Sequence, residues 1–93
     1  MKYLILIAML ASAPAQAGTV EVCNVLAEFV RNTARARDEG MSMAAAQAMV
    51  REGVSDSKLA SSLQETVRLV YTEGSSGSPD ALAMGMFNAC MEN

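Results

Sequence analysis

The chain has 93 residues, 52% hydrophobic and 18% charged, with 7 Lys and Arg against 10 Asp and Glu. This acidic balance argues against a general binder of nucleic acid or anionic membranes, because such proteins draw their affinity from an excess of Lys and Arg. The chain contains no His, which removes the commonest general base and the commonest metal ligand.

Residues 1–17 have the pattern of a secretory signal peptide. Lys2 precedes an apolar run over residues 3–11, and the small-x-small triplet Ala15-Gln16-Ala17 follows. A positive start, a short apolar stretch and such a triplet are typical of a segment that is removed after export. A membrane anchor is the weaker alternative, because the run is about half of the roughly 20 residues that span a bilayer. We predict cleavage before Gly18, a single domain over residues 18–93, and a periplasmic or secreted location without membrane insertion after cleavage.

The two cysteines of the chain, Cys23 and Cys90, are predicted to form a disulfide. Removing residues 1–17 leaves 76 residues, with 6 basic and 10 acidic side chains and a net charge of −4. A core of this size rarely contributes more than about 3–5 kcal/mol, so a covalent link is expected. Thiols of a small exported domain normally pair in an oxidising compartment. The bond would close a loop of about 68 residues and restrict the unfolded chain by roughly 4 kcal/mol.

The first predicted helix runs from about Val20 to Glu39, with Thr19 as its N-cap and Gly40 just past its end. Glycine is common directly after a helix. The apolar residues recur at the i, i+3, i+4, i+7 spacing of a helix with one buried face. They are Cys23, Leu26, Ala27, Val30 and Ala34, with Val22, Phe29 and Thr33 alongside.

Two further helices are predicted between Ser42 and Gly74. The second is an alanine-rich helix over residues 43–52, capped by Ser42 and ended by Gly53. The third is capped by Ser55, with Asp56 and Ser57 as the alternatives, and ends at Gly74. Its buried stripe is predicted to contain Leu59, Leu63, Val67, Val70 and Tyr71.

The fourth helix begins at Ser78-Pro79-Asp80, which supplies an N-cap, a proline at the first helical position and an acid in the first turn. Its apolar face carries Leu82, Ala83, Met86, Phe87 and Cys90. No segment has the strict alternation of a strand, so we predict an all-α fold, a small bundle of about four helices. A disulfide between Cys23 and Cys90 would make the first and last helices antiparallel neighbours.

The sequence does not predict an enzyme or a cofactor. Serines near Lys58, namely Ser55 and Ser57, sit where a helix begins and are better explained as capping residues than as a catalytic pair. Met41-Ser42-Met43 and Met84-Gly85-Met86 offer thioethers that would suit Cu(I). We favour the simpler interpretation that Met43, Met49 and Met86 fill gaps in a core with few aromatic residues, so no metal site is predicted.

Arg31, Arg35 and Arg37 form the densest group of charges and are the candidate partner-binding residues. The simpler interpretation is a solvated face on which Arg35 pairs with Asp38 or Glu39. The alternative hypothesis is that the arginines bind an acidic surface of a partner protein, because Arg is enriched at interface hot spots. A row of small residues, Ala81, Gly85 and Ala89, would allow close approach of a helix of the same chain or of a second copy in a homodimer.

Four features together resemble small secreted helical proteins of Gram-negative bacteria: the early Cys23, Arg37-Asp38-Glu39-Gly40, Val70-Tyr71 before a polar linker, and the terminal Cys90. The resemblance implies periplasmic residence and a helical fold, and it transfers no active residues. The small, helical architecture with one disulfide is also similar to periplasmic acid-stress chaperones of the HdeA kind, although their long charged tail is missing here.

We therefore expect a non-enzymatic periplasmic binding protein of inhibitor or immunity type, which acts on another periplasmic or secreted protein through a surface. The alternative is a periplasmic stress chaperone or envelope structural factor, because acid would protonate its carboxylates, leave a net positive charge and loosen the bundle.

Overall fold

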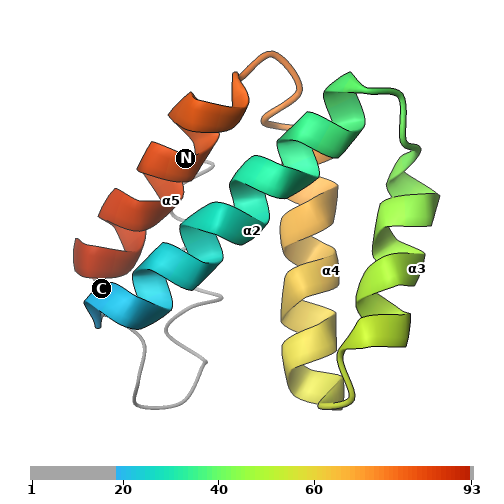
Figure 1. Ribbon diagram of the computed structural model, residues 1–93, viewed down its shortest axis with the longest axis horizontal. Helices are drawn as coiled ribbons and strands as arrows, with labels where there is room; N and C mark the ends of the chain where they lie inside the picture. The colour runs from blue at the N-terminus through green and yellow to red at the C-terminus, as the bar shows by residue number, and fades with distance from the viewer. Residues whose placement is uncertain (1–18, 93) are drawn as a thin grey trace.

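The computed structural model describes residues 19–92, so the predicted signal peptide lies outside the described residues. Four helices make up this region: α2 (Val20–Asp38), α3 (Met43–Gly53), α4 (Ser57–Tyr71) and α5 (Pro79–Glu92). Residues 19–92 contain no strand. The predicted all-α fold with four helices is confirmed (Figure 1).

Helix α2 has both of the ends that the sequence predicts. The hydroxyl of Thr19 accepts a hydrogen bond from the backbone N–H of Val22, at 3.2 Å. At the other end Gly40 has a φ of 105°, a conformation that residues with a side chain rarely adopt. The backbone N–H of Gly40 donates to the Arg37 carbonyl, and that of Met41 donates to the Ala36 carbonyl. These two bonds define a Schellman motif and satisfy carbonyls that the helix leaves open.

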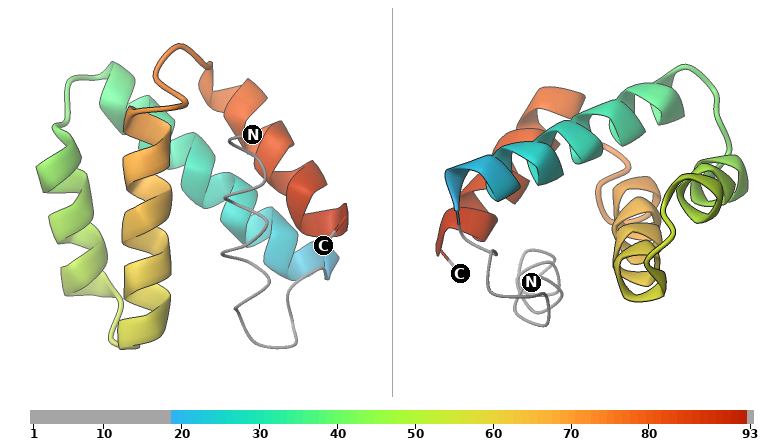
Figure 2. Two further views of the ribbon diagram at one scale, coloured as in Figure 1. Left: turned by 180° about the vertical axis from the view of Figure 1, so that it is seen from behind. Right: turned by 60° about the horizontal axis from the view of Figure 1, so that its bottom comes forward.

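Helices α3 and α4 form an antiparallel hairpin (Figures 1 and 2). Ser42 caps α3 by accepting from the backbone N–H of Ala45, as predicted. Among the three candidate caps of α4, the structure selects Asp56, whose Oδ1 accepts from the Leu59 backbone N–H at 2.9 Å. Helix α4 ends at Tyr71, three residues before the predicted end at Gly74.

Helix α5 lies antiparallel to α2, and the predicted disulfide joins them (Figure 1). The Cα atoms of Cys23 and Cys90 are 5.5 Å apart, and both residues are 0% exposed. Ser78 caps α5 through its hydroxyl, which accepts from the Ala81 backbone N–H at 3.1 Å. The disulfide between Cys23 and Cys90 therefore joins the beginning of α2 to the end of α5.

The core consists of two clusters that share Tyr71. The first lies between α2, α4 and α5 and contains the disulfide, and the second lies between α3 and α4 and also packs against Phe29 of α2. The buried members of the first are Cys23, Val30, Ala34, Val70, Met86 and Cys90. Those of the second are Ala46, Val50, Ala60 and Val67. Within residues 19–92, no helix is both long and apolar enough to cross a membrane.

Candidate functional site

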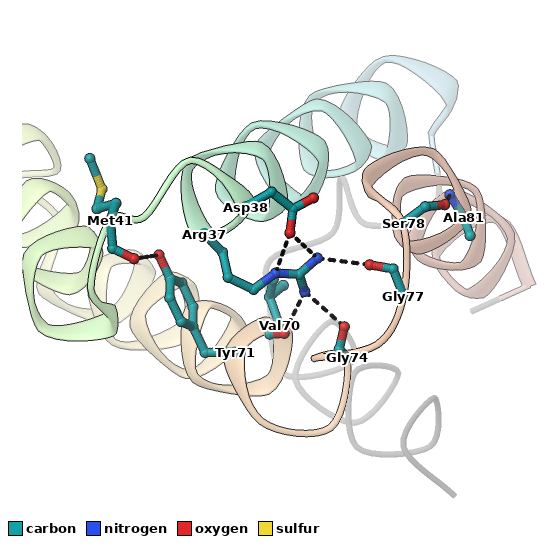
Figure 3. Close-up of polar contacts among 9 residues, drawn as sticks. All are labelled: Arg37, Asp38, Met41, Val70, Tyr71, Gly74, Gly77, Ser78 and Ala81. Carbon is teal, nitrogen blue, oxygen red and sulfur yellow. Dashed lines mark hydrogen bonds and ion pairs between the residues drawn. The ribbon is translucent and has the colours of Figure 1, made fainter.

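Arg37 is held inside the molecule by several contacts to one loop (Figure 3). Its Nη1 donates to the carbonyls of Val70 and Gly74, at 3.1 and 2.8 Å, and its Nη2 donates to the Gly77 carbonyl at 2.8 Å. Its Nε donates to Asp38 Oδ1 at 3.0 Å. Only 12% of the Arg37 side chain is exposed. The guanidinium of this predicted partner-binding residue is therefore engaged within the chain.

The Arg37 contacts explain why α4 ends before Gly74. In a continued helix the Val70 carbonyl would accept from the Gly74 backbone N–H, four residues later. The carbonyl accepts from Arg37 instead, and the Gly74 N–H donates to the Leu69 carbonyl at 2.8 Å. A charged side chain from α2 thus caps the end of α4.

The loop over residues 72–78 is also packed tightly against α5. A Cβ atom placed on Gly77 would lie 2.8 Å from Cδ2 of Leu82, and one on Gly74 would lie 3.1 Å from the same atom. The two glycines therefore allow the loop to approach Leu82 closely. The Ser/Gly segment that reads as a polar linker in the sequence is a fixed part of the fold.

Arg31 also connects two helices. Its Nε donates to Asp80 Oδ1 of α5 at 3.0 Å, and its Nη1 pairs with Glu28. The hydrogen bond to Asp80, followed by that to Glu28, raises the pKa of the Arg31 guanidinium. A charge-assisted contact of this kind fixes the distance between α2 and the start of α5.

Arg35 is exposed, and the ion pairs of the described residues do not include it. Its predicted pairing with Asp38 or Glu39 is not formed, because Asp38 pairs with Arg37. At 100° per residue, Arg31 and Arg35 share one side of α2 while Arg37 lies on another. The three arginines therefore do not form one patch.

An apolar groove of about 350 Å³ lies between α2, α3 and α4. We call α2 and α3 its walls and α4 its floor, because these helices contribute four, four and two of the lining residues. No Asp, Glu, Lys or Arg side chain lines it. The lining residues are Phe29, Asn32, Thr33, Ala36, Met41, Ala46, Met49, Val50, Gly53, Val54, Leu63 and Val67.

The polar groups beside the groove are already hydrogen-bonded within the protein. Thr33 donates its hydroxyl to the Phe29 carbonyl at 2.7 Å. The Tyr71 hydroxyl donates to the carbonyl of the lining residue Met41 at 2.7 Å, and burial raises the pKa of this phenol. The groove therefore offers a surface for apolar packing, with the Asn32 amide as a polar group at its edge.

Two apolar residues are exposed although the sequence predicts them to be buried. Leu59, predicted for the buried stripe of α4, is 49% exposed in the first turn of that helix. Met49, predicted to fill a gap in the core, is 60% exposed and lines the groove. Met43 packs against the second core cluster, and Met86 is only 2% exposed, as expected of core methionines. Met49 thus adds a flexible, polarisable side chain to the groove.

The other candidate features do not come together as sites. Met84 is 65% exposed while Met86 is buried, so the two thioethers of this Met-x-Met pair face different surroundings. Among residues 19–92, no group of three or more His, Cys, Asp or Glu residues could hold a metal ion.

Ser55, Ser57 and Lys58 are all exposed around the N-cap Asp56. The small-residue row changes from exposed Ala81 to buried Ala89 along α5.

A second concavity of about 530 Å³ lies between α2 and α5. The charged side chains of Glu28, Arg31 and Asp80 line it together with Asn24, Ala27, Ala83, Met84 and Phe87. Since Arg31 connects Glu28 and Asp80 there, these charges already have partners. This concavity is the natural comparison for the apolar groove, because each has one strongly exposed methionine among its lining residues.

Comparisons with protein-family models, with curated proteins and with solved structures found no match to this chain.

Proposed function

We propose that this chain is an exported, non-enzymatic binding protein that holds an apolar segment of another protein in the groove between α2, α3 and α4. The observation that carries the proposal is the groove, which has a volume of about 350 Å³ and no charged side chain in its lining. Exposed apolar surface in a concave form is typical of interaction sites. Met49 extends this surface into solvent.

The fixed position of the α2 wall supports a binding role. Helix α2 is tied to α5 by the disulfide and to the end of α4 by Arg37. Binding to a preorganised groove costs less conformational entropy than binding to a surface that must first be ordered. Inhibitors and immunity proteins need such a scaffold and no chemistry of their own, so we assign the chain to this class.

Two features favour an exported location. The chain contains a buried disulfide, and such bonds persist in oxidising compartments such as the bacterial periplasm. The segment 1–17 has the pattern of a signal peptide. The proposed partner is accordingly another periplasmic or secreted protein.

The test is paired capture from a native periplasmic extract with the oxidised, exported chain as bait. Three baits are compared: the unaltered chain, Met49→Gln in the groove, and Met84→Gln in the second concavity. Both methionines are more than half exposed, at 60% and 65%, so neither change removes a buried side chain.

We expect one stoichiometric protein to be retained by the unaltered chain and by Met84→Gln, and to be largely lost with Met49→Gln. Equal retention by all three baits would contradict the assignment of the groove. A spread of unrelated proteins that increases at low pH would favour a stress chaperone instead.

A further inference from the structure

Building on the proposed function, we infer that the groove accepts an amphipathic helix of about two turns, which inserts two large apolar side chains and carries basic residues at its edges. The inference follows from the dimensions of the groove, from the hydrogen-bonding state of its walls and from the charges beside it.

The length of the groove matches two turns of a helix. The α2 wall extends from Phe29 to Ala36 and the α3 wall from Ala46 to Gly53. Seven residue steps along a helix cover about 10 Å, which is also the distance between positions i and i+7 of a bound helix. An apolar cavity of about 150 Å³ takes one benzene-sized group, so a groove of about 350 Å³ has room for two such side chains.

The walls favour a helix over an extended segment. The groove is lined by side chains of three helices whose backbone groups are bonded within those helices, and the described residues have no sheet edge to which a strand could be added. An extended segment buried there would leave its own backbone N–H and C=O groups without partners, at a cost of free energy. A helix satisfies these groups internally and presents side chains on one face at i, i+3, i+4 and i+7.

The charges beside the groove favour a basic partner. Glu39, the C-cap of α2, follows the lining residue Ala36 by three positions, Glu52 of α3 follows Met49 by three, and Arg35 of α2 follows Asn32 by three. Two acidic side chains and one basic side chain therefore lie one turn beyond the lining residues. Both glutamates are exposed. The ion pairs of the described residues use Glu28, Asp38, Glu65 and Asp80 rather than these two. The described chain also carries 10 acidic against 6 basic side chains.

The probe is a fluorescein-labelled synthetic peptide that contains only leucine and lysine. In the first peptide, the leucines follow the i, i+3, i+4, i+7 spacing of a helix. In the matched peptide, the same residues alternate with the spacing of a strand. Fluorescence anisotropy is measured with the oxidised, exported chain at a salt concentration that screens exposed charges, so that total charge does not decide the result.

We expect the helix-patterned peptide to bind and the alternating peptide to bind at least about tenfold more weakly. Met49→Gln should weaken the helix-patterned peptide about five- to tenfold, since truncating or polarising an anchor contact costs affinity on that scale. Met84→Gln should leave its affinity within about twofold. Gln replaces Met without adding charge, so any change at Met49 reports apolar packing.

Three results would overturn the inference. Equal binding of both peptides would show that composition alone matters, and absence of binding would show that the groove does not take an amphipathic helix. Binding of vesicles of anionic and zwitterionic phospholipid that is lost with Met49→Gln, without peptide binding, would identify an acyl chain as the occupant. Each of these results can coexist with Met49-dependent capture of a protein, so failure of this inference is distinguishable from failure of the proposed function.

Discussion

The two halves of the molecule are held together in different ways. Helices α2 and α5 share a buried disulfide, an ion pair between Arg31 and Asp80, and a buried apolar seam. Helices α3 and α4 pack through the small side chains Ala46, Val50, Ala60 and Val67. The first half is a covalently fixed support, whereas the second half supplies the outer wall and the floor of the groove.

Two side chains connect these halves. Tyr71 belongs to both core clusters and donates to the Met41 carbonyl between α2 and α3. Arg37 reaches from α2 to the end of α4 and to the loop before α5. The shape of the groove therefore depends on a few polar contacts as well as on apolar packing.

The largest expected effect comes from removing the covalent bond of the first half. The double variant Cys23→Ala/Cys90→Ala should lose about 4 kcal/mol of stability, because the disulfide closes a loop with a sequence separation of 67 residues. Urea unfolding of the oxidised chain and of the variant, followed by circular dichroism, measures the loss. A loss below about 1 kcal/mol would contradict the role assigned to the bond.

Arg37→Met removes the main polar connection between the halves. It leaves the carbonyls of Val70, Gly74 and Gly77 without their charged donor, so we expect a loss of about 2–4 kcal/mol in the free energy of unfolding. Hydrogen exchange should become faster over residues 72–78. The matched control is Arg35→Met, which alters an exposed residue of the same helix and should change stability by less than about 0.5 kcal/mol. Equal effects of the two variants would refute the capping role of Arg37.

Replacing a glycine by alanine is expected to lower stability at Gly77 and to raise it at Gly53. Gly77→Ala places a Cβ atom 2.8 Å from Leu82 Cδ2 and should cost about 1–2 kcal/mol through overpacking. Gly53→Ala meets nothing within 4 Å at the end of α3 and should stabilise by up to about 1 kcal/mol. Thermal unfolding of both variants checks the difference in sign, and destabilisation by both would be inconsistent with the close approach at Leu82.

Tyr71→Phe is expected to have the smallest effect. It removes the hydrogen bond to the Met41 carbonyl and should cost about 1 kcal/mol. Burial raises the pKa of Tyr71 above its ordinary value, and nearby Arg37 opposes this shift. The folded state therefore prefers the neutral phenol, and the associated stability is present below the ordinary pKa of tyrosine and is lost as the pH rises through the raised value. Stability measured across the alkaline range should fall less steeply in Tyr71→Phe than in the unaltered chain.

Much of the fold follows from local sequence signals. Thr19, Ser42 and Ser78 cap the helices that they were predicted to cap, and Gly40 ends α2. The predicted pairing of the two cysteines is confirmed. These features depend on residues close in sequence, or on the absence of any other thiol, so a single sequence is sufficient to identify them.

The groove and the end of α4 depend on contacts between distant residues. Arg37 lies 33, 37 and 40 positions before the three residues whose carbonyls it binds, one at the end of α4 and two in the following loop, so no local pattern indicates its role. Met49 belongs to an alanine-rich helix whose buried side is narrow, and only the packing of α2 against the hairpin determines that its side chain stays exposed. Apolar periodicity predicts which residues avoid water, but not where three helices leave a space between them.

The central claim, that the groove is the binding surface, is tested most directly by mapping backbone amide chemical shifts. The oxidised, isotope-labelled chain is titrated with the helix-patterned leucine–lysine peptide. The account predicts that the largest shifts fall in residues 29–36, 46–54 and 63–67, which line the groove. Shifts concentrated instead at residues 24–28 and 80–87, around the second concavity, would contradict it.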